Sequence, residues 1–429
     1  MLKATVVLAA LLALWACSQA LRFEGNPFAN PVWKSASEVL GALPGSISIV
    51  PADTLATIIP VLLPFAVFTT GVLLFQSDAS ATRLLRFLAI SGGLVALYGL
   101  IQFEFFPDYL MFRKKDYYLD DLTSVLVNRN SIATYLGAAL LINAGFLFDS
   151  LIPVSPRRGR AGAAFHAQRL IQVDTYSVLH GFLAFVTLLA LLLTRSRGGI
   201  AATFVALSAL SVFLVIDGYW RIGQRTRRPS NGMARPSKWA SVSVAAAFIV
   251  LIFFLLGGRV LMRADMQGAE DARFCAYPSI VQLLKDNWLF GTGLGSFREA
   301  YERYQDPLCA HNRLWDRAHS FYLEGWIDLG VIFVPLLLVA VGGLILIFIS
   351  GIKNRKSRRW ASASGASVLL LFLLHSIVDF SIQIPGVAVF FAAIMAAASV
   401  LSLNRVRRNG VRQKRGPDGP NFTGLHQTS

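Results

Sequence analysis

Residues 321–350 read FYLEGWIDLGVIFVPLLLVAVGGLILIFIS, a run that carries charge only at Glu324 and Asp328, both near its start. About 20 mainly apolar residues are enough to cross the hydrocarbon core of a bilayer. A helix is the expected form of such a segment, because it pairs its backbone N–H and C=O groups internally where water is absent. We therefore predict that the chain crosses a membrane here.

The rest of the chain has the same character. Of its 429 residues, 55% are hydrophobic and 12% aromatic, and the mean hydropathy is +0.56, more than a soluble core requires. Nine further stretches are apolar enough to span a bilayer: 4–21, 57–75, 87–103, 130–148, 178–194, 199–217, 239–257, 362–378 and 387–403. The sequence thus predicts an all-α, polytopic transmembrane helical bundle of about ten spans.

The basic residues orient these spans. With the N-terminus inside, 24 of the 40 Lys and Arg residues fall on the cytoplasmic side. Connections rich in Lys and Arg resist translocation and remain in the cytoplasm. The longest connection, 258–320, is therefore expected on the outer side. The net charge of +16 reflects this topology, and we expect no nucleic-acid partner.

The chain is expected to form one membrane domain, residues 1–408, with a long outer loop at about 258–320. Residues 409–429 are rich in Gly, Pro, Asn and Arg, a composition typical of a disordered tail, here on the cytoplasmic side. The first segment fits either a spanning helix or a cleaved signal peptide ending at Ser18-Gln19-Ala20. Both readings of this segment remain open.

The outer loop is expected to be partly ordered. Ile280, Leu283 and Leu284 have helical spacing within 278–288. The following run FGTGLGSF, residues 290–297, favours a compact turn held by its two phenylalanines, because a phosphate loop would end in Gly-Lys-Ser/Thr and follow a strand.

Two of the three cysteines, Cys275 and Cys309, also lie in the outer loop. Outside the cell membrane such a pair can be oxidised to a disulfide, and two free thiols are the alternative. The sequence leaves both states open.

Arg195 and Arg197 lie on a very short outer connection, within Thr-Arg-Ser-Arg-Gly-Gly at 194–199. A guanidinium presents a planar fork of donors that matches phosphate oxygens and does not lose its charge. Arginines at helix ends also commonly extend toward lipid headgroups. Because positive charge is disfavoured on the outer side, we favour a role for this pair in binding an anion such as pyrophosphate.

His319 stands where the outer loop meets the span 321–350, and Tyr322, Glu324 and Asp328 follow it. Carboxylates that enter a membrane are costly unless they meet a cation or a polar cavity. Arg313 and Arg317 are also close to His319 in sequence. Histidine is the side chain best suited to proton transfer near neutral pH, so we predict a general base at His319 rather than a local helix cap.

Four further residues on the outer side are candidates. Arg129 opens the span 130–148 directly after Asn128, which could cap the helix. His375 and Asp379 are four residues apart and would share a helical face, either as structural partners or as part of a site. Arg273 is a candidate for anion binding or an ordinary solvated loop residue.

Taken together, these motifs resemble those of a known family, the O-antigen ligase and O-antigen polymerase (Wzy-type) superfamily of bacterial integral membrane glycosyltransferases. The resemblance covers most of the chain and rests on the order and sidedness of the motifs rather than on any one of them. They are Asn-Arg-Asn at 128–130, Thr-Arg-Ser-Arg-Gly-Gly at 194–199, Arg273 before the glycine-rich run 290–297, His-Ser-Phe-Tyr-Leu-Glu-Gly at 319–325 with Leu-Gly at 329–330, and His-Ser-Ile-Val-Asp-Phe at 375–380.

The resemblance implies transfer of a glycan from an undecaprenyl-pyrophosphate donor to a hydroxyl of lipid A-core or of a growing polysaccharide. It places the active site at the periplasmic face of the bacterial inner membrane and implies an inverting, metal-independent displacement, so we expect no cofactor. By motif, His319 matches the family's base, and Arg197 and Arg273 match arginines that hold the pyrophosphate. Ser131 stands where relatives often carry His, which weakens the assignment of the 128–130 motif.

Several alternatives remain open. The sequence does not separate a ligase from a polymerase, name the glycan, or decide whether a chain-length regulator takes part. A transporter or flippase of lipid-linked sugars would also have about ten spans, but ionisable residues at mid-membrane and internal repeats are expected there. A non-catalytic subunit of a polysaccharide export complex would leave His319 and the arginine pair without a role.

Overall fold

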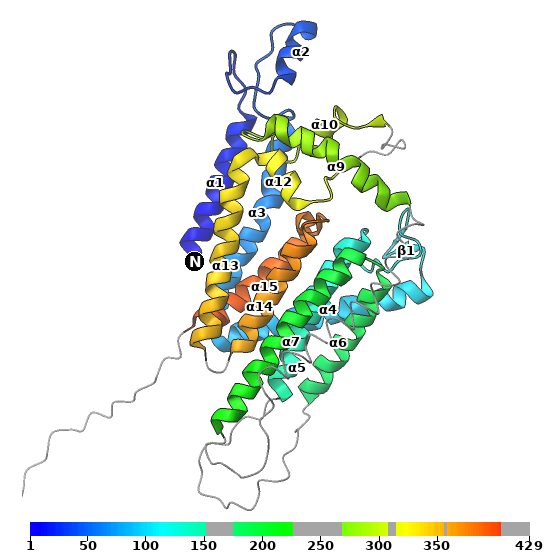
Figure 1. Cartoon of the computed structure of the whole chain (residues 1–429), viewed down its shortest axis with the longest axis vertical. Coiled ribbons are helices and arrows are strands. Elements are labelled where there is room, and N and C mark those ends of the chain that lie inside the picture. Colours follow the sequence, from blue (N-terminus) through cyan, green and yellow to red (C-terminus); the bar gives the residue numbers. More distant parts are fainter. Residues whose placement is uncertain (152–174, 226–267, 308–314, 356–357, 405–429) are drawn as a thin grey trace, which may run out of the picture.

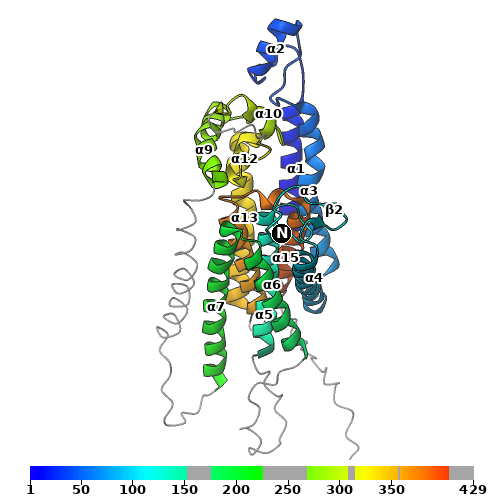
Figure 2. The same cartoon turned by 90° about the vertical axis from the view of Figure 1, so that its right-hand side faces the viewer.

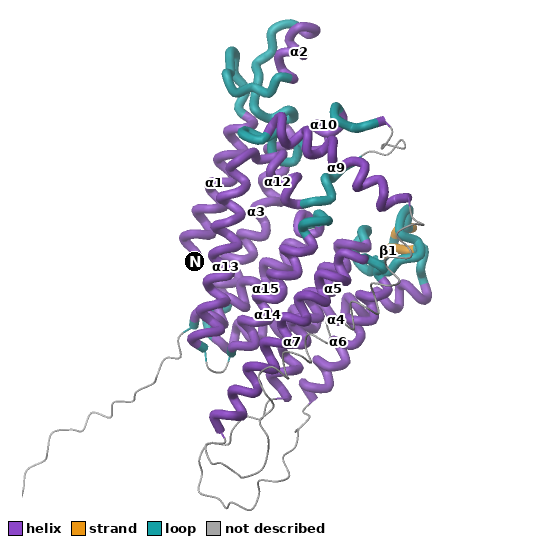
Figure 3. Tube along the Cα trace, in the orientation of Figure 1, coloured by secondary structure: helices purple, strands orange, loops and turns teal. Residues whose placement is uncertain are grey.

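The chain forms a bundle of long helices, as predicted. The computed structural model describes residues 1–151, 175–225, 268–307, 315–355 and 358–404. Its helices are α1 (Leu2–Ala20), α2 (Val32–Leu40), α3 (Pro51–Leu74), α4 (Asp78–Phe105), α5 (Arg129–Leu151), α6 (Thr175–Leu193), α7 (Arg197–Arg225), α9 (Gly268–Asn287), α10 (Phe297–Glu302), α12 (Phe321–Leu329), α13 (Phe333–Asn354), α14 (Arg359–His375) and α15 (Pro385–Leu403). Figure 3 shows how little strand accompanies them: β1 (Tyr109–Leu110) pairs with β2 (Arg113–Lys114) in one short hairpin.

Nine of the ten predicted spans coincide with these helices, and the tenth, 239–257, lies outside the described residues, as does the predicted tail 409–429. Within the described part, eight helical segments are long and apolar enough to cross a membrane. The predicted single helix at 321–350 is interrupted, because Gly330 has a φ of +67° and begins the 3-10 turn Gly330–Ile332. Only glycine adopts this backbone conformation without strain, so α12 ends here and α13 starts in a new direction.

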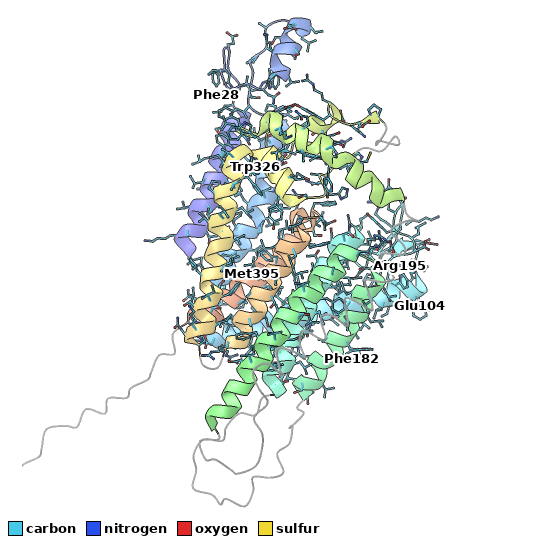
Figure 4. The ribbon with its side chains drawn as sticks, viewed as in Figure 1. Phe28, Glu104, Phe182, Arg195, Trp326 and Met395 are labelled. Carbon is cyan, nitrogen blue, oxygen red and sulfur yellow. The ribbon has the colours of Figure 1, made fainter. Side chains whose placement is uncertain are left out.

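The core is built around α5 and α15. Most of each helix is buried inside the protein, whereas few residues of α3 and α13 are buried, as expected for helices that face lipid. α5 packs against α4, α6, α7 and α14. Small residues permit this close packing: a Cβ at Gly92 of α4 would lie 2.5 Å from the Cβ of Ala139 in α5. Met395, labelled in Figure 4, is among the buried residues of α15.

The long helices run up and down the bundle, so their connections gather at two ends (Figure 1). We call the end where α3, α5, α7, α12 and α15 begin the upper end (Figure 1). Figures 1 and 2 agree that α9, α10 and α12 lie at this end, with α2 beyond them. The lower end is held by ion pairs on the predicted cytoplasmic side: Arg355 binds Asp78, and Arg359 binds Asp217 at 3.1 Å.

The described part of the outer loop is ordered, as expected. The predicted helix at 278–288 is the second half of α9, which packs against α12. Cys275 on α9 is disulfide-bonded and Cys17 is free, while Cys309 lies outside the described residues.

The glycine-rich run 290–297 forms a compact turn that docks on the end of α12. Thr292 N donates to Ile327 O at 2.8 Å, and Gly293 N donates to Asp328 O at 3.1 Å. Phe297 is buried and Phe290 half-buried. The predicted compact turn is confirmed, although hydrogen bonds to α12 hold it as well as the burial of Phe297.

We expect Gly291→Ala to lower stability by about 1–3 kcal/mol, because the backbone is held in a region that L-residues rarely adopt. Gly291 has a φ of +75°, and a Cβ there would lie 2.4 Å from Asp328 O. Thermal unfolding of the purified protein in detergent measures the effect. Gly342→Ala is the matched control, since a Cβ on Gly342 meets nothing within 4 Å. Equal melting temperatures for the two variants would contradict this account of the turn.

Candidate functional site

Every predicted site residue whose side chain the structure describes lies at or near the upper end. Arg129 and Arg197 are the first residues of α5 and α7, and His375 is the last of α14. His319 lies two residues before α12. The backbone of Arg273 is in α9, but its side chain lies outside the described residues.

One group of charges surrounds Asp121, in the connection between the short hairpin and α5. Arg129 Nη1 donates to Asp121 Oδ2 at 2.9 Å, and Arg195 Nη1 lies 4.0 Å from Asp121 Oδ1. Lys115 Nζ donates to the backbone oxygen of Asp121 at 3.3 Å. Burial lowers the pKa of Lys115, and the charges of Asp121 and Asp108 oppose that shift.

Arg195 combines exposure with an unusual backbone. Its side chain is 58% exposed, and Figure 4 shows it at the upper end beside the short hairpin. Its φ is +52°, which is uncommon for a residue other than glycine and costs about 1–3 kcal/mol. Such strain persists where the surroundings enforce it, and it occurs preferentially at functional sites.

Asp121→Asn is expected to lower stability by about 1–3 kcal/mol, because it weakens a charge-assisted hydrogen bond at a buried carboxylate. Asp120→Asn is the control, since Asp120 is adjacent in sequence, its side chain is exposed, and surface substitutions change stability little. Thermal unfolding of both variants in detergent checks this expectation. A melting temperature for Asp121→Asn equal to that of Asp120→Asn would show that Asp121 does not hold the arginines.

A second group is a buried hydrogen-bond network centred on Asp379, which is 1% exposed. Asn130 Nδ2 donates to Asp379 Oδ2 at 2.9 Å, and Ser381 Oγ donates to Asp379 Oδ1 at 2.5 Å. Ser196 Oγ donates to Asn130 Oδ1 at 2.7 Å. Through these bonds the connection 376–384, the start of α5 and the arginine turn 194–199 are fixed to one another.

The prediction that His375 and Asp379 share a helical face is wrong. α14 ends at His375, so Asp379 lies in the connection that follows, where it can turn toward α5. His375 Nδ1 lies 2.6 Å from Thr134 Oγ1, and its ring approaches the first turn of α7, where a Cβ on Gly198 would be 3.2 Å from Nε2. The two residues therefore support the same junction from different segments.

The first turns of α5 and α7 are capped by side chains, which fixes the backbone at the arginines that begin these helices. Asn128 Oδ1 accepts from Asn130 N at 2.7 Å, so the predicted helix cap is confirmed. Ser196 Oγ accepts from Gly199 N at 3.3 Å at the start of α7. Arg197 is half-buried at this helix N-terminus, an end whose partial positive charge favours anions.

His319 lies between two aromatic rings. Its ring centroid is 5.5 Å from that of Trp315 and 5.3 Å from that of Phe380. Its φ is +52°, the same uncommon conformation as that of Arg195. Ser320 follows as the N-cap of α12, and Phe321 N donates to Ser376 O at 3.0 Å, which brings the segment against the end of α14.

Glu324 receives hydrogen bonds from both sides of its carboxylate although its residue exposure is 0%. Arg317 Nη1 donates to Oε1 at 2.8 Å, and Ala318 N donates to Oε2 at 2.8 Å. Gln383 Nε2 also donates to Oε1, at 3.0 Å. Burial alone would lower the pKa of Arg317, but the charge and hydrogen bond of Glu324 raise it overall, so Arg317 stays a cation.

Asp328 and Tyr322, which follow His319 in sequence, each bind another segment. Asp328 was expected to pair with a cation or face a polar cavity, and it instead accepts from Gly295 N at 2.8 Å in the glycine-rich turn. Tyr322 donates its hydroxyl hydrogen bond to Leu373 O at 2.8 Å, tying α12 to α14. Asp328 thus holds the glycine-rich turn, and Tyr322 holds the end of α14.

Sequence reasoning singled out neither Asp121 nor the polar partners Ser196, Thr134 and Ser381. These residues could have been found from the many Ser, Thr, Asn and Asp residues at the upper ends of the apolar segments, because polar groups buried there need hydrogen-bond partners. Across the described residues, no group of three or more His, Cys, Asp and Glu side chains is placed to hold a metal ion.

In a comparison with protein families, residues 182–334 fit the family model described as O-antigen ligase. The matched region contains the arginine turn 194–199, the glycine-rich turn, His319 and α12, but not the motifs at 128–130 and 375–380. A search of curated proteins finds no match. Over residues 182–334 the chain is thus similar to the O-antigen ligase family, in agreement with the resemblance of its motifs to the O-antigen ligase and polymerase superfamily.

Proposed function

We propose that this protein transfers a glycan from an undecaprenyl-pyrophosphate donor to a hydroxyl acceptor, either lipid A-core or a growing polysaccharide, at the periplasmic face of the inner membrane. The observation that supports it most is the junction of the His319 segment, the 376–384 connection and the arginine turn. His319 and the arginine turn both lie within the region that fits the O-antigen ligase family model. A base and an anion-binding turn are the two elements that such a transfer needs.

In the proposed reaction, the acceptor oxygen forms a bond to the anomeric carbon of the donor sugar. The bond between that carbon and the pyrophosphate oxygen breaks, and the electron pair leaves with undecaprenyl pyrophosphate. His319 takes the acceptor's proton. Attack opposite the leaving group inverts the anomeric configuration, and the displacement needs no metal.

Arg197, Arg195 and Arg273 are proposed to bind the pyrophosphate, with Arg129 in support. Fixed guanidinium groups stabilise the developing charge of the leaving group without reorganising water. The N-terminus of α7 adds its own partial positive charge beside Arg197. His375 and Asp379 hold the start of α5 through Thr134 and Asn130, and Asn130 in turn binds Ser196 in the turn that carries Arg195 and Arg197.

The test is an in vitro transfer assay in nanodiscs with undecaprenyl-pyrophosphate-linked glycan as donor and EDTA present. Lipid A-core and a second donor molecule are offered as separate acceptors. Product on lipid A-core identifies a ligase, and a ladder of longer lipid-linked glycans identifies a polymerase. If neither acceptor is modified while labelled lipid-linked sugar crosses the bilayer, the enzyme proposal fails and a transporter replaces it.

A further inference from the structure

We infer that Glu324 is a positioning residue for His319: its buried carboxylate fixes the backbone just before His319 and ties it to the 376–384 connection. This inference rests on the proposed function, because it gives Glu324 a role only if His319 acts as the base. It assigns Glu324 no contact with donor or acceptor.

The geometry of the carboxylate supports this role. Its two oxygens accept from three donors in two different segments, Arg317 and Ala318 before α12 and Gln383 after α14. A charge buried to this degree is tolerated only when it is paired and hydrogen-bonded, and here both oxygens have partners. The carboxylate therefore acts as a clamp between the 317–318 segment and the turn η2 (Ser381–Gln383).

The clamp matters because His319, the residue after Ala318, has an unusual backbone conformation. His319 adopts a φ of +52°, which must be enforced by neighbouring contacts. On its N-terminal side the enforcing contact is Ala318 N to Glu324, and on its C-terminal side it is the Ser320 cap of α12. Fixing both neighbours fixes the direction in which the imidazole leaves the backbone.

The clamp also controls what surrounds the imidazole. Gln383 belongs to the same connection as Phe380, whose ring contacts His319, and as Asp379, which leads to Asn130 and the arginine turn. Loss of the Glu324 contacts would therefore change the position of the base relative to the leaving-group site. A displacement of about 1 Å can cost 10²-fold in rate without weakening substrate binding.

The experiment compares Glu324→Gln with the wild type and with Asp328→Asn in the nanodisc transfer assay. The glutamine keeps the shape of the side chain but replaces one acceptor oxygen by an NH₂ donor, which faces Arg317 or Ala318 N. We expect kcat to fall about 10- to 100-fold while KM for the donor changes less than about threefold. Asp328 is buried on the same helix but contacts the glycine-rich turn, so Asp328→Asn is expected to lower stability and keep kcat.

A purely structural role for Glu324 predicts a different pattern, in which both variants lose stability and kcat stays near the wild-type value for the folded fraction. Gln383→Leu and the double variant of His319→Ala with Glu324→Gln separate the cases. Gln383→Leu removes one tie to the clamp and is expected to lower kcat by a smaller factor; if Glu324→Gln does not fold, an unchanged kcat in Gln383→Leu overturns the inference.

In the His319→Ala background, Glu324→Gln should cause no further loss of residual transfer, and an additional tenfold loss would show that Glu324 acts independently of His319. The failures of the two proposals are also distinguishable. Normal transfer by His319→Ala overturns the general-base assignment, whereas loss of transfer in His319→Ala with wild-type kcat in folded Glu324→Gln overturns only the positioning role.

Discussion

His319→Ala is expected to lower the rate of glycan transfer about 10²- to 10⁴-fold, the contribution usual for a positioned general base. The acceptor hydroxyl is a weak nucleophile until its proton is removed, and His319 is the residue held at the junction of α12 and the 376–384 connection. The measurement is the initial rate in the nanodisc assay at equal amounts of folded protein.

Donor binding provides the internal check on this variant. Alanine removes the imidazole but leaves Arg195, Arg197 and the start of α7 unchanged, so the donor should still bind. His180→Asn is a suitable control, because His180 on α6 is a buried histidine whose ring stacks on Phe146 of α5. Wild-type rates for His319→Ala, or equal losses for the two histidine variants, would remove His319 from the chemistry.

The helical bundle was predictable because long apolar segments have essentially one way to satisfy their backbone in lipid. That constraint is local, so the described spans were found to within a few residues from composition alone, as for α6 and α15. The positions of Arg129, Arg197 and His319 at the upper end also followed, since alternating helices place every second connection on one side.

The partners of these residues were not predictable in the same way. Glu324 binds Gln383, which is far away in sequence, and Asp379 binds Asn130 on α5, because helix packing brings separate connections together. Spacing rules assume that a helix continues, and they failed where α14 ends at His375 and where Gly330 interrupts the span 321–350. Asp121 lies in a polar connection whose fold depends on contacts with α4 and α6, for example Leu122 N to Leu193 O.

Arg197 is the arginine for which the structure offers the most support as a donor contact. It occupies the first turn of α7, whose cap Ser196 is bonded to Asn130, so its backbone is held by the network around Asp379. Arg195 is more exposed and lies near Asp121, which already balances part of its charge. A pyrophosphate bound at the start of α7 would meet Arg197 and the helix N-terminus together.

Arg197→Ala is therefore expected to raise KM for the lipid-linked donor about 10- to 100-fold, because a charge-assisted contact to a phosphate near low-dielectric lipid contributes about 1.5–3 kcal/mol. Arg197→Lys should recover only part of the loss, since an ammonium keeps the charge but not the planar fork of donors. Arg22→Ala is the matched control, because Arg22 is an arginine of the outer connections that stacks over Trp33. Steady-state transfer at varied donor concentration separates KM from kcat for all three variants. An unchanged KM in Arg197→Ala, or an equal rise in Arg22→Ala, would mean that the donor pyrophosphate binds elsewhere than at the start of α7.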